Sequence, residues 1–207
     1  MEKTMKLFGT PGSPYVRKVR IALGEKRKAY EYIIDRPSNP DSKVPLFNPL
    51  GKIPVLVCDD GRAIYDSSVI VEYLDGVIEA PRLIPGNFAD RIEVRRWEAL
   101  GDGIADATVA ISHNLRKPEA EREAQAWYER QRDKITRGLA TMEQDLGDRS
   151  FCHGDGFTLA DIAAGFALGY LDQVLSDINW RKSSPRLSNL AERLAKRDSF
   201  ASTLPAS

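Results

Sequence analysis

Residues 51–67 read GKIPVLVCDDGRAIYDS, and the order of structural signals in this stretch decides the fold that we expect. Apolar and β-branched residues predict one strand at 54–58 and a second at 62–65. The Asp-Asp-Gly sequence at 59–61 is typical of a hairpin turn, so the two strands should pair antiparallel. A helix is predicted to follow over residues 67–78, because apolar side chains recur there on one face. The stretch therefore predicts a β-β-α unit.

The residues before this stretch predict a β-α-β unit. Residues 5–9 and 29–35 read as two further strands, and a turn around Ser13 and Pro14 leads into an amphipathic helix between them. The basic residues expected to face away from the apolar side of this helix are Arg17, Lys18 and Arg20. Residues 36–50 hold four prolines and two asparagines and are expected to be mostly loop.

The pattern changes after a linker, which two prolines and a glycine place at residues 81–88. Beyond it the spacing predicts helices alone, because apolar residues step by three and four. The stepping residues are Trp97, Leu100, Ile104, Ala107 and Ile111, then Ile135, Leu139, Met142 and Leu146, and finally Leu187, Leu190 and Leu194. Residues 162–171 are almost entirely apolar and predict a buried central helix, and Thr158 with Asp161 forms a capping box before it. The expected domains are 1–80 and 89–207.

Composition excludes several classes of protein. The 207 residues carry 30 basic and 30 acidic side chains, and neither half is strongly basic, which argues against a nucleic-acid surface. The longest nearly apolar run is too short to span a membrane, and the first residues do not resemble a signal peptide. Cys58 and Cys152 are too few and too far apart for a disulfide scaffold or a structural zinc site, and we expect neither to be catalytic. This cysteine usage fits a reducing cytoplasm.

Ser13 is the first candidate for chemistry. It precedes Pro14, a residue favoured at the first position of a helix, and serine is a preferred N-cap. A hydroxyl at a helix N-terminus lies in a positive field, which would stabilise a bound thiolate. The alternative is that Ser13 only caps the helix.

Two further candidates lie around the β-β-α stretch. The bond from Ile53 to Pro54 is a candidate cis peptide that would turn the Ile53 backbone toward a ligand, although a trans proline at a strand start is the commoner case. Lys52 could neutralise a carboxylate or be simply solvated. Ser67, as a helix N-cap, could bind a carboxylate through its N–H and Asp66 could accept from an ammonium group, or both could serve only to cap the helix.

In this order the features resemble the cytosolic glutathione S-transferases, and the chain looks closest to small bacterial members with serine near the first helix. The resemblance extends from about Met5 to Phe200. The matching segments are SPYVRK at 13–18, NPLGKIPVL at 48–56, Asp66-Ser67, and the Gly-Asp and Thr-x-Ala-Asp elements within 154–161. The resemblance implies an α/β thioredoxin-like N-terminal domain with Pro54 in cis, followed by an all-α C-terminal domain.

The resemblance also implies a function and a set of site residues. Ser13 would face the sulfur of glutathione and activate it as a thiolate for attack on a small hydrophobic electrophile. The residues that would bind glutathione are Lys52, Ile53, Pro54, Asp66, Ser67 and Asp102, the last reaching across a homodimer. No metal, nucleic acid or membrane is expected. Other members of this fold are isomerases, dehalogenases, lyases or reductases that use glutathione, or non-catalytic ligand-binding and regulatory proteins.

A polar stripe on the first long helix has two readings. Its members are Arg95, Asp102, Asp106, Val109 and His113. The stripe is either a solvated face or the wall of a cleft and subunit surface, and His113 is expected at the surface near a helix end.

Overall fold

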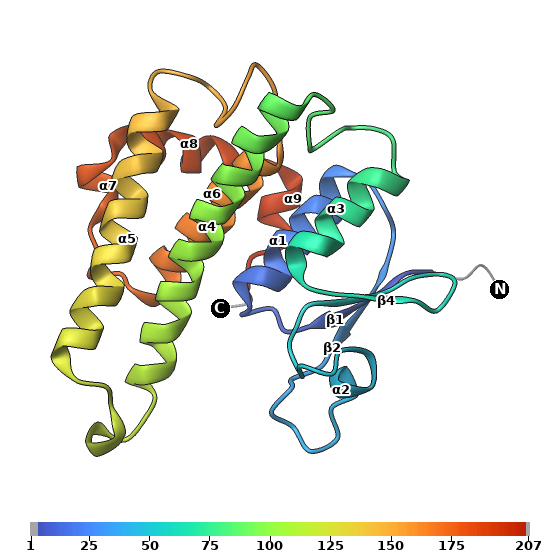
Figure 1. The fold of residues 1–207 in the computed structure, drawn as a ribbon, viewed down its shortest axis with the longest axis horizontal. Helices are drawn as coiled ribbons and strands as arrows, with labels where there is room; N and C mark the ends of the chain where they lie inside the picture. Colours follow the sequence, from blue (N-terminus) through green and yellow to red (C-terminus); the bar gives the residue numbers. More distant parts are fainter. Residues whose placement is uncertain (1–3, 206–207) are drawn as a thin grey trace. The chain divides into compact units, whose positions relative to one another are not determined.

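The computed structural model describes residues 4–205, which form two compact units (Figure 1). Residues 4–84 together with 197–205 make the first unit, and residues 85–196 make the second. The first unit is a mixed sheet with helices and the second is helical throughout, which is the fold class predicted from the sequence.

The sheet of the first unit has four strands in the order β2-β1-β3-β4. They are β1 (Lys6–Gly9), β2 (Glu31–Ile34), β3 (Val55–Val57) and β4 (Ala63–Ile64). β1 and β2 are parallel because a helix joins them, whereas β1 with β3 and β3 with β4 are antiparallel. The β3–β4 pair is the predicted hairpin, and its turn is closed by the Gly61 N–H, which donates to the Cys58 carbonyl at 2.9 Å.

Side chains alternate across the sheet and so build two layers on it. Helices α1 (Pro14–Glu25) and α3 (Ser67–Val77) contact each other on one face (Figure 1). On the other face Phe8 and Val55 contact α2 (Val44–Phe47), where the Phe8 and Phe47 rings lie 5.0 Å apart. The sequence did not predict α2, since a single turn within a proline-rich segment leaves no periodic signal.

The last described segment belongs to the first unit by its contacts. Helix α9 (Asp198–Ala201) packs on α1, where Glu25 accepts from Arg197 at 2.9 and 2.7 Å and from the Ser199 hydroxyl at 2.5 Å. A Cβ on Gly24 would meet the Ser199 Cβ at 3.0 Å, so the two backbones approach closely. The helical pattern of the sequence had placed these residues with the second domain.

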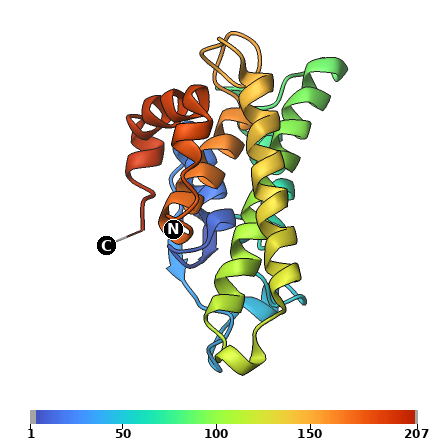
Figure 2. The same cartoon turned by 90° about the vertical axis from the view of Figure 1, so that its left-hand side faces the viewer.

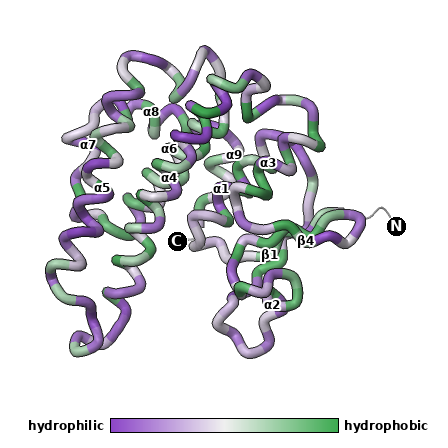
Figure 3. The backbone as a smooth tube through the Cα atoms, in the orientation of Figure 1, coloured by the Kyte–Doolittle hydropathy of each residue, from purple (hydrophilic) through white to green (hydrophobic). Residues whose placement is uncertain are grey.

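The second unit is built on α4 (Phe88–Leu115) and α5 (Gln125–Leu146), which lie side by side (Figure 2), and on α6 (Leu159–Val174) and α8 (Pro185–Ala195). The short elements η1 (Glu119–Glu121) and α7 (Trp180–Ser183) were not predicted. Much of α5 is hydrophilic (Figure 3), as expected for a helix with one buried face. No helix within residues 4–205 is long and apolar enough to cross a membrane.

Helix α6 is the buried centre of this unit, as predicted. Its capping box is formed, because the Thr158 N–H donates to Asp161 Oδ2 at 2.9 Å and the Ala160 N–H donates to Thr158 Oγ1 at 3.2 Å. Gly101 of α4 lets that helix approach closely, since a Cβ there would lie 2.6 Å from the Ala163 carbonyl oxygen.

Candidate functional site

The strand topology of the first unit gathers three chain segments at one edge of the sheet. Phe8 pairs with Val55 in the antiparallel β1–β3 ladder, so the end of β1 lies beside the residues that precede β3. Ile64 pairs with Leu56, so the chain leaves β4 at this same edge. The residues that follow β1, precede β3 or follow β4 here are Ser13, Lys52, Ile53, Pro54, Asp66 and Ser67. Six of the seven predicted site residues therefore come from one edge.

Ser13 is the N-cap of α1, as predicted. Its Oγ accepts from the Val16 N–H at 3.4 Å, which is a long hydrogen bond. A hydroxyl also has a proton to donate, and within residues 4–205 the Ser13 hydroxyl donates to no partner. The side chain is partly exposed, so a ligand at the helix N-terminus could receive that hydrogen bond.

The bond between Ile53 and Pro54 is cis, as predicted, and Pro54 is buried. The Ile53 backbone lies outside the strand ladder, which begins at Val55. Asn48, which sequence reasoning did not single out, organises this loop from within: its amide donates to the Lys52 carbonyl at 2.8 Å and accepts from the Leu50 N–H at 3.0 Å. Lys52 itself is exposed. The only available signal in the sequence was the turn-forming composition of residues 48–51, Asn-Pro-Leu-Gly.

Asp66, and not Ser67, is the N-cap of α3. Its Oδ1 accepts from the Ser68 N–H at 3.1 Å and the Val69 N–H at 3.4 Å. The prediction that Ser67 caps the helix is wrong, because the cap lies one residue earlier and Ser67 is the first helical residue, 4% exposed. Asp66 is exposed, and its Oδ2 makes no hydrogen bond among the residues that the structure describes.

A buried ammonium group connects the two helices of the site. Lys18 of α1 is fully buried, and its Nζ donates to the Ser68 hydroxyl of α3 at 3.0 Å. Arg17, its neighbour, is 8% exposed. The sequence predicted only that these residues face away from the apolar side of α1, and the structure shows that Arg17 and Lys18 are nonetheless buried, whereas Arg20 is half-buried and covers the Tyr32 ring. Both cations place positive charge in the unit that carries the site.

Comparison with known proteins agrees with this geometry. Residues 7–81 match the family model for the glutathione S-transferase N-terminal domain, and residues 125–193 match the one for the C-terminal domain. An uncharacterized GST-like protein, YibF of Escherichia coli (strain K12), is 40% identical over 97% of this chain and 98% of its own length.

The chain belongs to the glutathione S-transferase family.

Two solved structures of this family are similar along the whole chain. A glutathione S-transferase from Methylobacillus flagellatus KT, crystallised with glutathione bound, is 44% identical with a TM-score of 0.94, over 98% of this chain and 100% of that one. A glutathione transferase family member from Pseudomonas fluorescens Pf-5, crystallised with S-(propanoic acid)-glutathione, is 36% identical with a TM-score of 0.87, over 99% of this chain and 100% of that one.

Asp102, the seventh predicted site residue of this glutathione S-transferase family member, lies on α4 in the second unit and is partly exposed. Its approach to a glutathione site remains a prediction. His113 is exposed near the end of the same helix, as expected.

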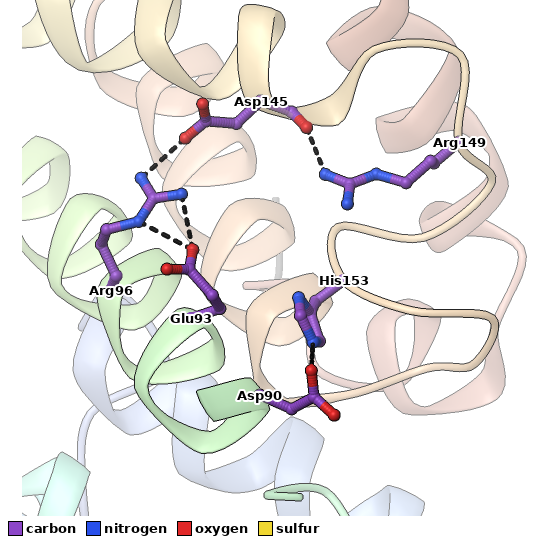
Figure 4. Close-up of polar contacts among 6 residues, drawn as sticks. All are labelled: Asp90, Glu93, Arg96, Asp145, Arg149 and His153. Atoms are coloured by element: carbon purple, nitrogen blue, oxygen red, sulfur yellow. Dashed lines mark hydrogen bonds and ion pairs between the residues drawn. The ribbon is translucent and has the colours of Figure 1, made fainter. Parts of the chain in front are cut away.

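A polar cluster of the second unit holds that unit together (Figure 4). His153 Nε2 lies 2.9 Å from Asp90 Oδ1, which ties the loop before α6 to the first turn of α4. Hydrogen bonds from Asn87 and then from His153 hold the pKa of the Asp90 carboxyl below its usual value. Arg96 pairs with Asp145 at 2.7 Å and so joins α4 to α5. These groups are engaged with one another, which indicates a packing role.

A cavity of about 540 Å³ lies between α5 and the residues around α7. Its charged lining is already paired: Arg132 contacts Asp177 at 2.6 Å, and Arg186 lies 4.0 Å from Glu143. Trp180 lines it but is 2% exposed. No predicted site residue lines this cavity.

Both cysteines are buried within their units, Cys58 at 5% exposure and Cys152 completely. Burial, and secondly the nearby Asp161 carboxylate, raises the pKa of the Cys152 thiol well above its ordinary value. A thiol in this environment is a poor nucleophile at neutral pH, which supports the expectation that Cys152 is structural.

Proposed function

We propose that this chain is a glutathione transferase that binds glutathione at the sheet edge of its first unit and activates the thiol for attack on a small hydrophobic electrophile. The observation that carries the proposal is that three structural elements able to bind a ligand lie at that edge. They are the N-cap hydroxyl of α1, a backbone segment outside the ladder before β3, and the N-terminus of α3. Family members crystallised with glutathione or an S-linked derivative support it.

Each of these three elements suits one part of the tripeptide. The Ile53 backbone, turned by the cis bond to Pro54, pairs with the cysteinyl residue as a strand would. The Ser67 N–H at the α3 N-terminus binds the γ-glutamyl carboxylate, and Asp66 accepts from its ammonium group. Lys52, which is exposed beside this backbone, neutralises the glycyl carboxylate. Asp102 of a second subunit contributes a further acceptor for the amine.

Ser13 acts on the sulfur. A free thiol has a pKa of about 8.5, and each unit by which the pKa falls corresponds to about 1.4 kcal/mol. A hydrogen bond to a charged group contributes about 1.5–3 kcal/mol, so one from Ser13 lowers the thiol pKa by about one to two units. The helix N-terminus adds a smaller contribution. Together they make the thiolate the dominant form near neutral pH. Serine cannot form a mixed disulfide, so the proposal is nucleophilic addition or substitution by glutathione.

The test separates activation from capping with two substitutions. Ser13→Ala removes both the hydroxyl and the cap, and should cost about 1 kcal/mol of stability. Ser13→Gly removes the hydroxyl but retains the cap to within a few tenths of a kcal/mol. If Ser13 activates the thiol, the ultraviolet thiolate absorbance of bound glutathione titrates about one to two pH units higher in both variants. At a pH above the thiol pKa of bound glutathione in both the parent and the variant, the affinity for glutathione should fall much less than the turnover does.

A capping role predicts a different pattern. Ser13→Ala then loses stability, Ser13→Gly behaves as the parent, and the bound thiol titrates at the same pH in all three proteins. That result would refute the assignment of Ser13 as the activating residue.

If calorimetry shows that the parent protein does not bind glutathione, the proposed function as a whole is refuted. A regulatory or ligand-binding protein of the same fold would then be favoured.

The proposed active form is a homodimer. Large hydrophobic side chains are exposed on both units, and a second copy of the chain would cover them. They include Leu46 at 78%, Leu50 at 69% and Val69 at 50% in the first unit, and Phe88 at 78% and Ile92 at 48% in the second.

A further inference from the structure

Arg17 of α1 carries a buried charge without a counter-ion. The residue is 8% exposed, and its Nε is buried with no hydrogen-bond partner. Among residues 4–205 no carboxylate pairs with the guanidinium. Burial, and secondly the charge of Arg20, lowers the pKa of Arg17 from its ordinary value. A buried, unpaired cation is unfavourable for folding alone, so its presence calls for another explanation.

The other two basic side chains of α1 have partners. Lys18 donates to the Ser68 hydroxyl at 3.0 Å. Arg20 covers the Tyr32 ring at 4.7 Å and donates to the Ser202 carbonyl at 3.1 Å. Arg17 therefore differs from its neighbours in the described part of the chain, and the difference is not a general property of this helix.

The helix geometry places Arg17 one turn after Ser13. The Arg17 N–H donates to the Ser13 carbonyl at 3.0 Å, so the two residues are one turn apart on the same face. Long side chains on a helix lean back toward its N-terminus and cover the preceding turn. The four-bond stem of an arginine is long enough to span a helical turn, so the guanidinium is within reach of a ligand bound at the Ser13 hydroxyl.

We propose that Arg17 is the counter-ion for an anion held at the Ser13 hydroxyl, an inference that rests on the proposed function. The anion is either the glutathione thiolate or a carboxylate on the group joined to its sulfur. The guanidinium suits both, because it keeps its charge when buried and its planar donors match a carboxylate in pairs. In the second case the protein prefers electrophiles that carry a carboxylate over neutral ones.

The test compares Arg17→Met and Arg17→Lys with the parent, and Arg20→Gln is the matched control from the same helix. Two probes of similar size are S-(2-carboxyethyl)glutathione and S-propylglutathione, whose affinities are measured by calorimetry. The third probe is the pH titration of the thiolate absorbance of bound glutathione. Thermal unfolding of each free protein is recorded as well. Arg17→Met should unfold at the same temperature as the parent or higher, because it removes an unpaired buried charge.

A carboxylate partner predicts that Arg17→Met loses about ten- to a hundred-fold in affinity for the carboxyethyl ligand and nothing for the propyl one. A thiolate partner predicts instead that the bound thiol titrates about one pH unit higher. Arg17→Lys should change either quantity less than Arg17→Met does, since lysine keeps the positive charge but lacks the planar donors. The inference is overturned if neither quantity moves in Arg17→Met, or if Arg20→Gln moves them equally. If the parent binds no glutathione, the proposed function fails first, and this inference fails with it.

Discussion

Asp75 should be among the most sensitive positions for stability, although it lies in no predicted site. It is 4% exposed at the end of α3, and its Oδ1 lies 2.7 Å from the Nζ of Lys26, which is also buried. The same carboxylate accepts from the Leu83 N–H at 2.7 Å and the Ile84 N–H at 3.2 Å. One side chain thus satisfies a buried ammonium and two buried backbone donors.

Asp75→Ala would leave all three groups without this acceptor. Breaking one side of a buried ion pair costs about 3–5 kcal/mol, and an orphaned buried donor costs about 1–3 kcal/mol. Lys26 retains the Ile78 carbonyl at 2.7 Å, so we expect the total loss to be about 4 kcal/mol, a large share of the 5–15 kcal/mol typical of a folded protein. In the double variant with Lys26→Met no buried charge remains, and the loss should shrink to about 2–3 kcal/mol.

Urea unfolding followed by circular dichroism measures these differences, with the four proteins of the double-mutant cycle compared at equal denaturant slope. The reasoning is refuted if Asp75→Ala costs less than about 1 kcal/mol, which would mean that the carboxylate contributes no more than a surface group. It is also refuted if Lys26→Met brings no recovery, since the buried ammonium would then not be the main source of the loss.

Three further predictions concern pH, the thiols and assembly. Burial opposes ionisation of Glu25, but the hydrogen bonds from Arg197 and Ser199 outweigh it and lower the pKa of the carboxyl. The contribution of Glu25 to stability is therefore present above its unfolded pKa and is lost as the pH falls through its folded pKa. Glu25→Gln should therefore lose less melting temperature than the parent does as the pH is lowered, and an equal loss in the two proteins would contradict this. Replacing Cys58 and Cys152 together by alanine should leave the rate of glutathione conjugation largely intact, and loss of turnover in a folded variant would reject their structural assignment. Light scattering at low micromolar concentration should give twice the 23.1 kDa of one chain, and a single-chain mass would count against the homodimer.

Local patterns in the sequence predicted the main elements because those elements are governed by local rules. The β3–β4 hairpin follows from its turn residues, and the start of α6 follows from the capping box of Thr158 and Asp161. The candidate site was predictable to the extent that it lies at strand ends and helix N-termini: Ser13 was recognisable as a cap, whereas the cap of α3 was predicted at Ser67, one residue after its true position at Asp66.

The features that the sequence did not predict depend on contacts between distant residues. The burial of Lys18 was not predicted, because lysine is usually exposed and its partner Ser68 lies fifty residues away in the sequence. The burial of Arg17 was not predicted either. The role of Asn48 depends on the folding of a loop around its amide, which no periodicity reports.

The return of residues 197–205 to the first unit has a consequence for biosynthesis. Because these residues follow the whole second unit in the chain, every residue of the second unit has been translated before the first unit is complete. The Glu25 carboxylate and the close backbone approach at Gly24 obtain their partners only after the second unit has been translated. The unit that carries the proposed glutathione site therefore cannot be completed until residues 85–196 have been translated, so its folding depends on a segment that lies beyond an entire second unit in the chain.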